Sequence, residues 1–236
     1  MYGAYQDITA QKQAAEALAK AKAENKLAMI VLGAQWCHDS VGLSTKFSTQ
    51  SMQRILRDKY VTAFMDIGYL EDRRFITQRF DYPAVFGTPT VLIVEPNTET
   101  LLNYDTVSKW QAAYSVPLED YLTYFDSIKG ETERKTSSKD LTAAHAKVAA
   151  FEQQQVERLY KAYAVLGPLL KADEDGTLEY KDAFYDKWNQ VYQFRSKLQQ
   201  DLIALRSELN TRKSDLDKSR LVLPTYPPFE WELDIQ

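Results

Sequence analysis

The first half of the chain alternates between continuous apolar runs and amphipathic stretches. The run LAMIVLGA at 27–34 is apolar throughout, which predicts a buried central strand. We expect further strands at 61–68, 90–95 and 100–104, the last two joined by a hairpin turn at Pro96-Asn97. Helices are predicted over 10–26, from Cys37 to Arg57 with a break near Ser48-Thr49, over 72–80 and over 116–129. This alternation predicts an α/β fold for residues 1–130.

A different pattern follows Gly130. Residues 131–140 are polar and charged, which predicts a linker. Residues 141–214 carry two apolar stripes at spacings of three and four, separated by a turn at Gly176, and predict an antiparallel helical hairpin. In the tail at 215–236, Pro224, Pro227 and Pro228 precede FEWELDIQ and disfavour a helix, so we expect an extended strap.

Composition and charge narrow the classes of function. The chain has 236 residues, 44% hydrophobic and 26% charged, with a net charge of −4, and its acids and bases are mixed along the sequence. Such a chain has no basic field to attract nucleic acid or an anionic membrane, so we expect neither as a partner. It contains one cysteine, so any disulfide that it forms must join it to another molecule.

That cysteine, Cys37, lies where the first predicted strand gives way to a helix. A helix N-terminus carries partial positive charge and free backbone N–H groups, which stabilise a thiolate, the nucleophilic form of cysteine. A protonated His38 would strengthen this effect and Asp39 would oppose it. The position therefore indicates a reactive thiol.

The segment GAQWCHDS after a buried strand, followed later by GTPT at Gly87–Thr90, resembles the thioredoxin superfamily. In detail it is similar to bacterial thioredoxin-like proteins with a W-C-H-D-S box. The resemblance covers residues 25–128 and implies a central sheet flanked by helices. It also implies that Cys37 is the attacking cysteine and Trp36 its aromatic shield, and that the Thr88-Pro89 bond is cis and faces the thiol. Substrate would then dock at Gly87, Thr88 and Pro89.

Two departures from the family pattern change the expected chemistry. Ser40 stands where the family has its resolving cysteine, and Val31 stands where it has a buried acid. A serine hydroxyl can hydrogen-bond a thiolate but cannot expel a mixed disulfide. The resemblance therefore implies a monothiol thiol–disulfide oxidoreductase or isomerase acting on protein or glutathione disulfides. The resolving thiol would come from outside: glutathione, a partner's cysteine or a second cysteine of the substrate.

Simpler interpretations remain open. Cys37 can be a small buried hydrophobe in a non-catalytic module that binds a protein partner through the same groove or through the hairpin. His38 and Asp39 can be solvated residues at the start of a helix, and Ser40 a polar residue of its first turn. Two helices alone bury little apolar surface, so the hairpin is expected to pack on the thioredoxin-like domain or on a second copy of the chain, which would make a homodimer through the C-terminal helices.

No metal and no cofactor are expected. The two histidines, His38 and His145, lie on separate predicted domains, and zinc needs three or four convergent ligands. An iron–sulfur cluster bridged by two monothiol subunits, as in some glutaredoxins, is not expected, because this chain lacks that family's glutathione-binding residues. The turn ADEDGTLEYKDAF resembles a calcium loop, but Lys171 occupies the first ligand position, where a carboxylate belongs.

The compartment is left open by the residues themselves. Met1 leads directly into a polar, Ala-rich stretch in which no signal peptide is visible. Because the group that the chain resembles is often exported, we expect a periplasmic or otherwise exported mature protein, with the cytoplasm as the alternative.

Overall fold

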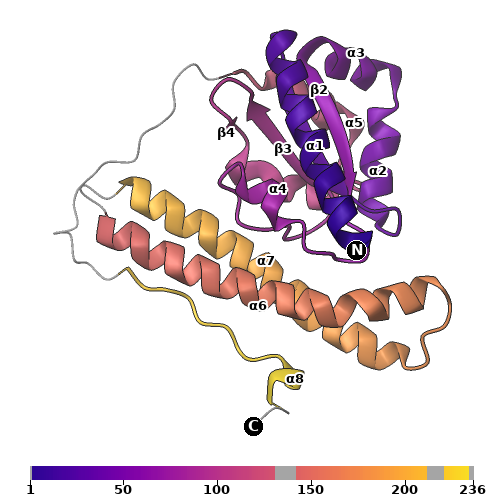
Figure 1. The fold of residues 1–236 in the computed structure, drawn as a ribbon, viewed down its shortest axis with the longest axis vertical. Helices are drawn as coiled ribbons and strands as arrows, with labels where there is room; N and C mark the ends of the chain where they lie inside the picture. The colour runs from indigo at the N-terminus through magenta and orange to yellow at the C-terminus, as the bar shows by residue number, and fades with distance from the viewer. Residues whose placement is uncertain (1, 131–141, 212–220, 234–236) are drawn as a thin grey trace. The chain divides into compact units, whose positions relative to one another are not determined.

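The computed structural model describes residues 2–130, 142–211 and 221–233. They form two compact units, which are described separately (Figure 1). The first unit lies within Met1–Gly68 and Asp72–Arg134, and the second within Tyr69–Glu71 and Lys135–Gln236. The predicted linker at 131–140 lies outside the described residues.

The first unit is built on a four-stranded sheet with the order β2-β1-β3-β4. The strand β1 (Leu27–Gly33) lies in its interior, parallel to β2 (Tyr60–Asp66) and antiparallel to β3 (Thr90–Glu95). The short β4 (Thr100–Leu101) completes it. A strand with neighbours on both sides and layers on both faces needs apolar residues throughout, which explains the continuous run of β1. This α/β architecture confirms the predicted fold class.

Helices cover both faces of the sheet. Alternate residues of β1, such as Met29 and Val31, join a core with α2 (His38–Phe47), α3 (Gln50–Lys59) and α5 (Leu118–Ser127). The intervening residues of β1 are equally buried and belong to the face that α1 (Tyr2–Ala23) covers, as Figure 1 shows. The short α4 (Arg74–Gln78) contacts α1. The layers hold the C-terminal end of β1, and with it the start of α2, in a fixed position.

Two predicted elements of this unit differ from the structure. The helix predicted to begin at residue 10 begins at Tyr2. The strand predicted over 100–104 ends at Leu101 and is followed by a 3-10 helix, η1 (Tyr104–Ala112). The buried side chain of Asn103 explains the early end, because it accepts a hydrogen bond from the Ile93 N–H (2.8 Å) and donates one to the Val91 carbonyl (2.9 Å). A side-chain amide thus satisfies backbone groups of β3 that a longer strand would have paired.

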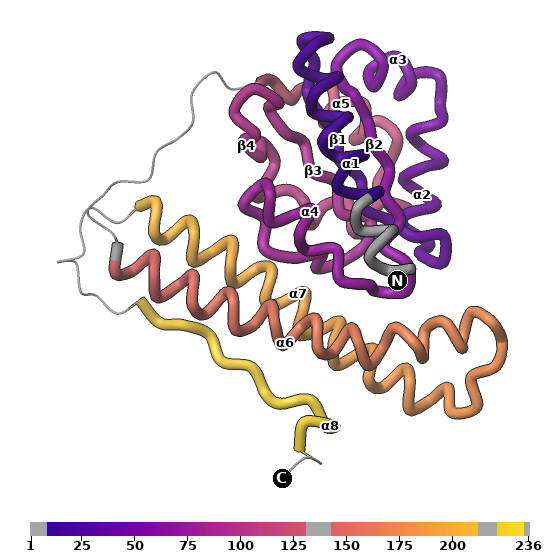
Figure 2. Tube along the Cα trace, viewed as in Figure 1, coloured from indigo at the N-terminus to yellow at the C-terminus, as the bar shows by residue number. Residues whose placement is uncertain are grey.

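The second unit contains the predicted helical hairpin. Figure 2 shows α6 (Thr142–Glu174) and α7 (Lys181–Thr211) side by side and antiparallel. Gly176 adopts a φ of 71° in the turn between them, a conformation that glycine takes without strain. The apolar stripes of both helices are buried, whereas Tyr185 and Tyr192 are exposed. Dimerisation through this hairpin stays a prediction. None of the described helices combines the length and the apolar character that crossing a membrane requires.

The C-terminal segment packs on the hairpin. Residues 221–229 run without regular structure, as expected for a strap, but a short helix, α8 (Glu230–Leu233), follows them and was not predicted. Phe229 is buried against Phe194 of α7, with the ring centroids 5.3 Å apart. Arg158 of α6 donates to the Pro227 carbonyl (2.6 Å) and to both carboxylate oxygens of Glu232. The strap is therefore held by an aromatic contact and by one arginine.

The attachment of this strap should depend on pH. Burial raises the pKa of Glu232, but hydrogen bonds from Arg158 and from the Phe229 N–H outweigh it and hold the pKa below its ordinary value of 4.5. A carboxylate with a lowered pKa stabilises the folded state above its unfolded pKa, and this contribution is lost as the pH falls through the folded value. We expect the strap to loosen as the pH falls below 4.5. Fluorescence of Trp231, taken as the difference from Trp231→Phe, should report a transition there. The same transition in Glu232→Gln, which cannot titrate at this position, would contradict the assignment.

Candidate active site

Cys37 lies at the start of α2, close after the end of β1. Its backbone is extended (φ −89°, ψ 113°), and its carbonyl accepts the first helical hydrogen bond, from the Val41 N–H at 3.0 Å. Its own N–H donates to the Ala34 carbonyl at 3.2 Å, which closes the turn between strand and helix. The residue is half-buried. The sulfur therefore belongs to the N-cap residue of a ten-residue helix and is not sealed in the core.

The loop Gly87–Thr90 meets this sulfur. The Cys37 thiol donates a hydrogen bond to the Thr88 carbonyl, with Sγ and O 3.2 Å apart. The Thr88-Pro89 peptide bond is cis. The Thr90 hydroxyl donates to the Gly87 carbonyl at 2.7 Å and fixes the loop from within. Only the protonated thiol can make the contact to Thr88, because a thiolate has no hydrogen to donate. The fold thus brings Cys37 to a loop that contains Gly87, Thr88 and Pro89. Thr88 lies 51 residues after Cys37 in the sequence.

Because residue 87 is glycine, the side chain of Gln111 in η1 can approach the loop closely. A Cβ built on Gly87 would lie 2.9 Å from Cδ of Gln111, well inside van der Waals contact. Gln111 is half-buried, and its side-chain nitrogen has no hydrogen-bond partner among the described residues. The sequence held no signal for Gln111, because its approach to Gly87 depends on where η1 packs.

Trp36 ties the strand-to-helix turn to the end of β2. Its indole N–H donates to the Gly68 carbonyl at 2.8 Å, and the residue is half-buried. This hydrogen bond spans 32 positions of sequence and restrains the turn that carries Cys37. Trp36 therefore lies beside the cysteine in the chain and is anchored by its polar end.

His38 and Asp39 both engage Tyr114, a residue that the sequence did not single out. The His38 and Tyr114 rings lie with their centroids 3.7 Å apart at an angle of 42°. A carboxylate oxygen of Asp39 accepts a hydrogen bond from the Tyr114 N–H at 3.0 Å. The charge of Asp39 also reaches Tyr121 of α5: burial raises the pKa of the Tyr121 hydroxyl, and the negative charge of Asp39 raises it further. Asp39 thus connects α2 to the segment after η1, and no local pattern around Tyr114 could have revealed this.

Ser40 supports the turn. Its hydroxyl oxygen accepts a hydrogen bond from the Ala34 N–H at 3.3 Å. Val31, at the position of the family's buried acid, is buried in the core cluster. The hydroxyl of Ser40 is therefore engaged with the backbone that precedes Cys37, as a polar residue of the first turn would be.

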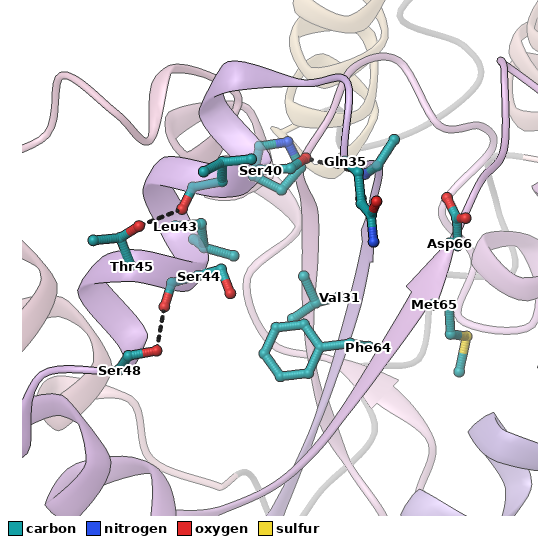
Figure 3. Close-up of a pocket in the computed structure, with 14 residues that line it drawn as sticks. Val31, Gln35, Ser40, Leu43, Ser44, Thr45, Ser48, Phe64, Met65 and Asp66 are labelled. Carbon is teal, nitrogen blue, oxygen red and sulfur yellow. Dashed lines mark hydrogen bonds between the residues drawn. The ribbon is translucent and has the colours of Figure 1, made fainter.

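A pocket of about 550 Å³ opens between α2 and β2 beside these residues. In Figure 3, Val31 and Phe64 face Ser44, Thr45 and Ser48 across it. The sequence did not predict this pocket, because its lining is drawn from β1, α2, β2 and the proline loop. Fourteen residues line it: Val31, Gly33, Ala34, Gln35, Ser40, Val41, Leu43, Ser44, Thr45, Ser48, Phe64, Met65, Asp66 and Pro89.

The described residues offer no group of three or more His, Cys, Asp or Glu side chains placed to hold a metal ion. In the turn that resembles a calcium loop, Asp173 pairs with Lys181 at 2.9 Å and Asp175 pairs with Lys171. These carboxylates are therefore balanced by lysines of their own turn.

The packing of α2 against Tyr114 is close enough to test. A Cβ built on Gly42 would lie 2.7 Å from the Tyr114 Cα, a backbone atom that cannot rotate away. We expect Gly42→Ala to lower the free energy of unfolding by about 1–3 kcal/mol, although alanine favours the helix by up to about 1 kcal/mol. Calorimetry of the unfolding transition checks this, with the exposed Arg54→Ala of α3 as control. A Gly42→Ala chain that is more stable than the wild type would contradict the close packing.

A family model agrees with this architecture. Residues 9–96 match a family model described as thioredoxin-like. Among curated proteins, none matches the chain. The solved structure of a disulphide isomerase from Xylella fastidiosa Temecula1 is similar over 49% of this chain and 88% of its own, with 22% sequence identity and a TM-score of 0.46.

The family match covers the strand that precedes Cys37, the helix that follows it and the strand that begins at Thr90. These elements carry both the thiol and the proline loop. The first unit of this chain therefore contains a thioredoxin-like domain.

Proposed function

We propose that this protein is a monothiol thiol–disulfide oxidoreductase or isomerase in which Cys37 is the nucleophile. The observation that carries the proposal is the half-buried Cys37 thiol at the start of α2, 3.2 Å from the Thr88 carbonyl. This sulfur belongs to the N-cap residue, at the positive end of the helix dipole, which favours a thiolate, although the thiol makes no capping hydrogen bond to the helix. The Gly87–Thr90 loop beside it could hold a substrate.

The exchange proceeds by transfer of one sulfur–sulfur bond. The Cys37 thiolate attacks one sulfur of the substrate disulfide, a bond forms between them, and the other sulfur leaves with the electron pair as a thiolate. Before the attack the Cys37 thiol loses its proton to solvent, which breaks the hydrogen bond to the Thr88 carbonyl and frees the sulfur. The product is a mixed disulfide on Cys37 and one released thiol.

Release of the substrate from its mixed disulfide with Cys37 needs a thiol from outside the chain, because the chain has no second cysteine. If a second cysteine of the substrate attacks the substrate sulfur, Cys37 leaves as thiolate and the substrate disulfide is rearranged. If a small thiol such as glutathione attacks the Cys37 sulfur, the substrate leaves reduced, and another equivalent of that thiol regenerates Cys37. The first route is isomerisation and the second is reduction, with the small thiol as electron donor.

The reactivity of the thiol tests this proposal. We expect iodoacetamide to alkylate Cys37 faster in the folded protein at pH 7 than in the urea-unfolded chain, measured by mass spectrometry. The folded protein should also form a mixed disulfide with a disulfide-linked peptide, and Cys37→Ser should form none. If Cys37 in the folded protein reacted with neither iodoacetamide nor the disulfide-linked peptide, the proposal would be contradicted. A non-catalytic module that binds a protein partner would then be favoured.

A further inference from the structure

The pocket between α2 and β2, defined above by its fourteen lining residues, adjoins the reactive sulfur. Pro89 lines it and follows Thr88, whose carbonyl contacts the Cys37 thiol. Ala34 lines it and accepts a hydrogen bond from the Cys37 N–H. Ser40, one helical turn after Cys37, also lines it. A substrate segment whose cysteine meets Cys37 would therefore have this pocket within reach of a neighbouring side chain.

The lining favours an uncharged, apolar group. Phe64 and Val41 present apolar surface, with 54% and 52% of each residue exposed, whereas Val31 and Leu43 also line the pocket but are buried. None of the fourteen lining residues is basic, and Asp66 contributes the one carboxylate among them. An anionic ligand, including a tripeptide thiol with two carboxylates, would meet no positive charge there. Covering Phe64 with an apolar side chain would remove its surface from water.

The neighbouring strand indicates that the ligand is an extended polypeptide. Among the described strands, β2 is the outermost on its side of the sheet, with β1 as its neighbour. Its sequence, YVTAFMD, has no proline, and its one charge is at the end, in Asp66. An outer strand with these features can pair with an added strand. A second hollow of about 310 Å³ continues along β2 and shares Ser44, Ser48 and Phe64 with the pocket.

We propose that this pocket takes an apolar side chain from the substrate segment that carries the disulfide, and so selects substrates with a bulky apolar residue near the reacting cysteine. This inference rests on the proposed function of Cys37 and names its substrate class. A volume of about 550 Å³ accommodates one such side chain together with its adjoining backbone. Phe64 and Val41 are then specificity-determining residues of the exchange.

Two peptides test the proposal. Both carry the same disulfide and the same net charge, and they differ only in a leucine or a serine two residues from the reacting cysteine. The measured quantity is the second-order rate constant for mixed-disulfide formation on Cys37. We expect the wild type to prefer the leucine peptide by about tenfold or more, the range that apolar pockets give.

Two variants then locate the preference. Ser44→Trp places a large side chain in the pocket from an exposed helix position, and Phe64→Ser removes apolar surface from the opposite side. Both should bring the ratio of the two rate constants close to one. Arg54→Trp, which adds the same ring at an exposed position of α3 outside the pocket, should keep the wild-type ratio. The far-UV circular dichroism of each variant checks that it is folded.

The outcomes separate this inference from the proposed function. A wild-type ratio near one, with both peptides reacting, overturns the pocket's role and leaves the exchange activity standing. A folded Ser44→Trp and a folded Phe64→Ser that both keep the preference overturn it as well. A wild type that reacts with neither peptide removes the proposed function, and this inference with it. A tenfold preference that both variants abolish and Arg54→Trp retains supports the proposal.

Discussion

Replacing Ser40 by cysteine should convert this monothiol centre into a self-resolving one. Residue 40 lies three positions after Cys37 in the first turn of α2, so a thiol there would be a near neighbour of any mixed disulfide on Cys37. It would attack the Cys37 sulfur, form an intramolecular disulfide and release the substrate as a thiolate. An intramolecular thiol acts at a high effective concentration, so we expect release at least about 100-fold faster than in the wild type without added thiol. Mass spectrometry of the peptide adduct over time measures the release.

The control for this experiment is Ser40→Ala, which removes the hydroxyl that accepts from the Ala34 N–H and supplies no thiol. Its mixed disulfide should persist as long as that of the wild type. If the Ser40→Cys adduct were equally long-lived, residue 40 would not face the sulfur of Cys37. The absence of a cysteine at position 40 would then not explain why this chain needs an outside thiol.

Trp110→Ala should destabilise the first unit more strongly than Gly42→Ala does. Trp110 is fully buried, stacked on Phe125 at 4.6 Å and edge-on to Tyr121 at 4.7 Å. Removing a buried tryptophan leaves a cavity as well as lost apolar contact, at a cost of about 3–5 kcal/mol. Hydrogen exchange of the β1 amides, read by mass spectrometry on the full chain, should become correspondingly faster. This readout reports the first unit alone.

Trp110→Phe is the matched comparison. The indole nitrogen of Trp110 is buried and has no hydrogen-bond partner among the described residues. Phenylalanine keeps much of the ring and removes this unsatisfied donor, so it should cost clearly less than alanine. Equal protection of β1 in Trp110→Ala and the wild type would show that η1 does not hold the sheet.

Much of the site could be predicted from the chain because its parts are local. The apolar run 27–34 placed a buried strand directly before Cys37, and the change to helical periodicity placed the cysteine at a helix start. Departures at Ser40 and Val31 could be read from sequence because they are single positions in a short segment. Each of these conclusions depends on neighbouring residues only.

Other features could not be predicted because they depend on distant packing. Asn103 ends the strand through side-chain hydrogen bonds to Val91 and Ile93 of β3, and these partners, ten or more residues away, cannot be read from the local sequence. Tyr114 engages Asp39 from 75 residues away and also contacts the neighbouring His38. The exposure of Phe64 follows from its place on an outer strand, although its sequence context resembles that of a core residue.

The sequence by itself determined the α/β order of the first unit, the helical hairpin and the single thiol at a strand-to-helix junction, because periodicity and composition act within a few residues of the chain. Only the tertiary structure decided that the Cys37 thiol meets the Thr88 carbonyl and that a pocket opens beside it. Contacts between segments far apart in sequence are set by how the layers pack. The chemistry of the thiol is thus encoded locally, and what it can bind is settled by the fold.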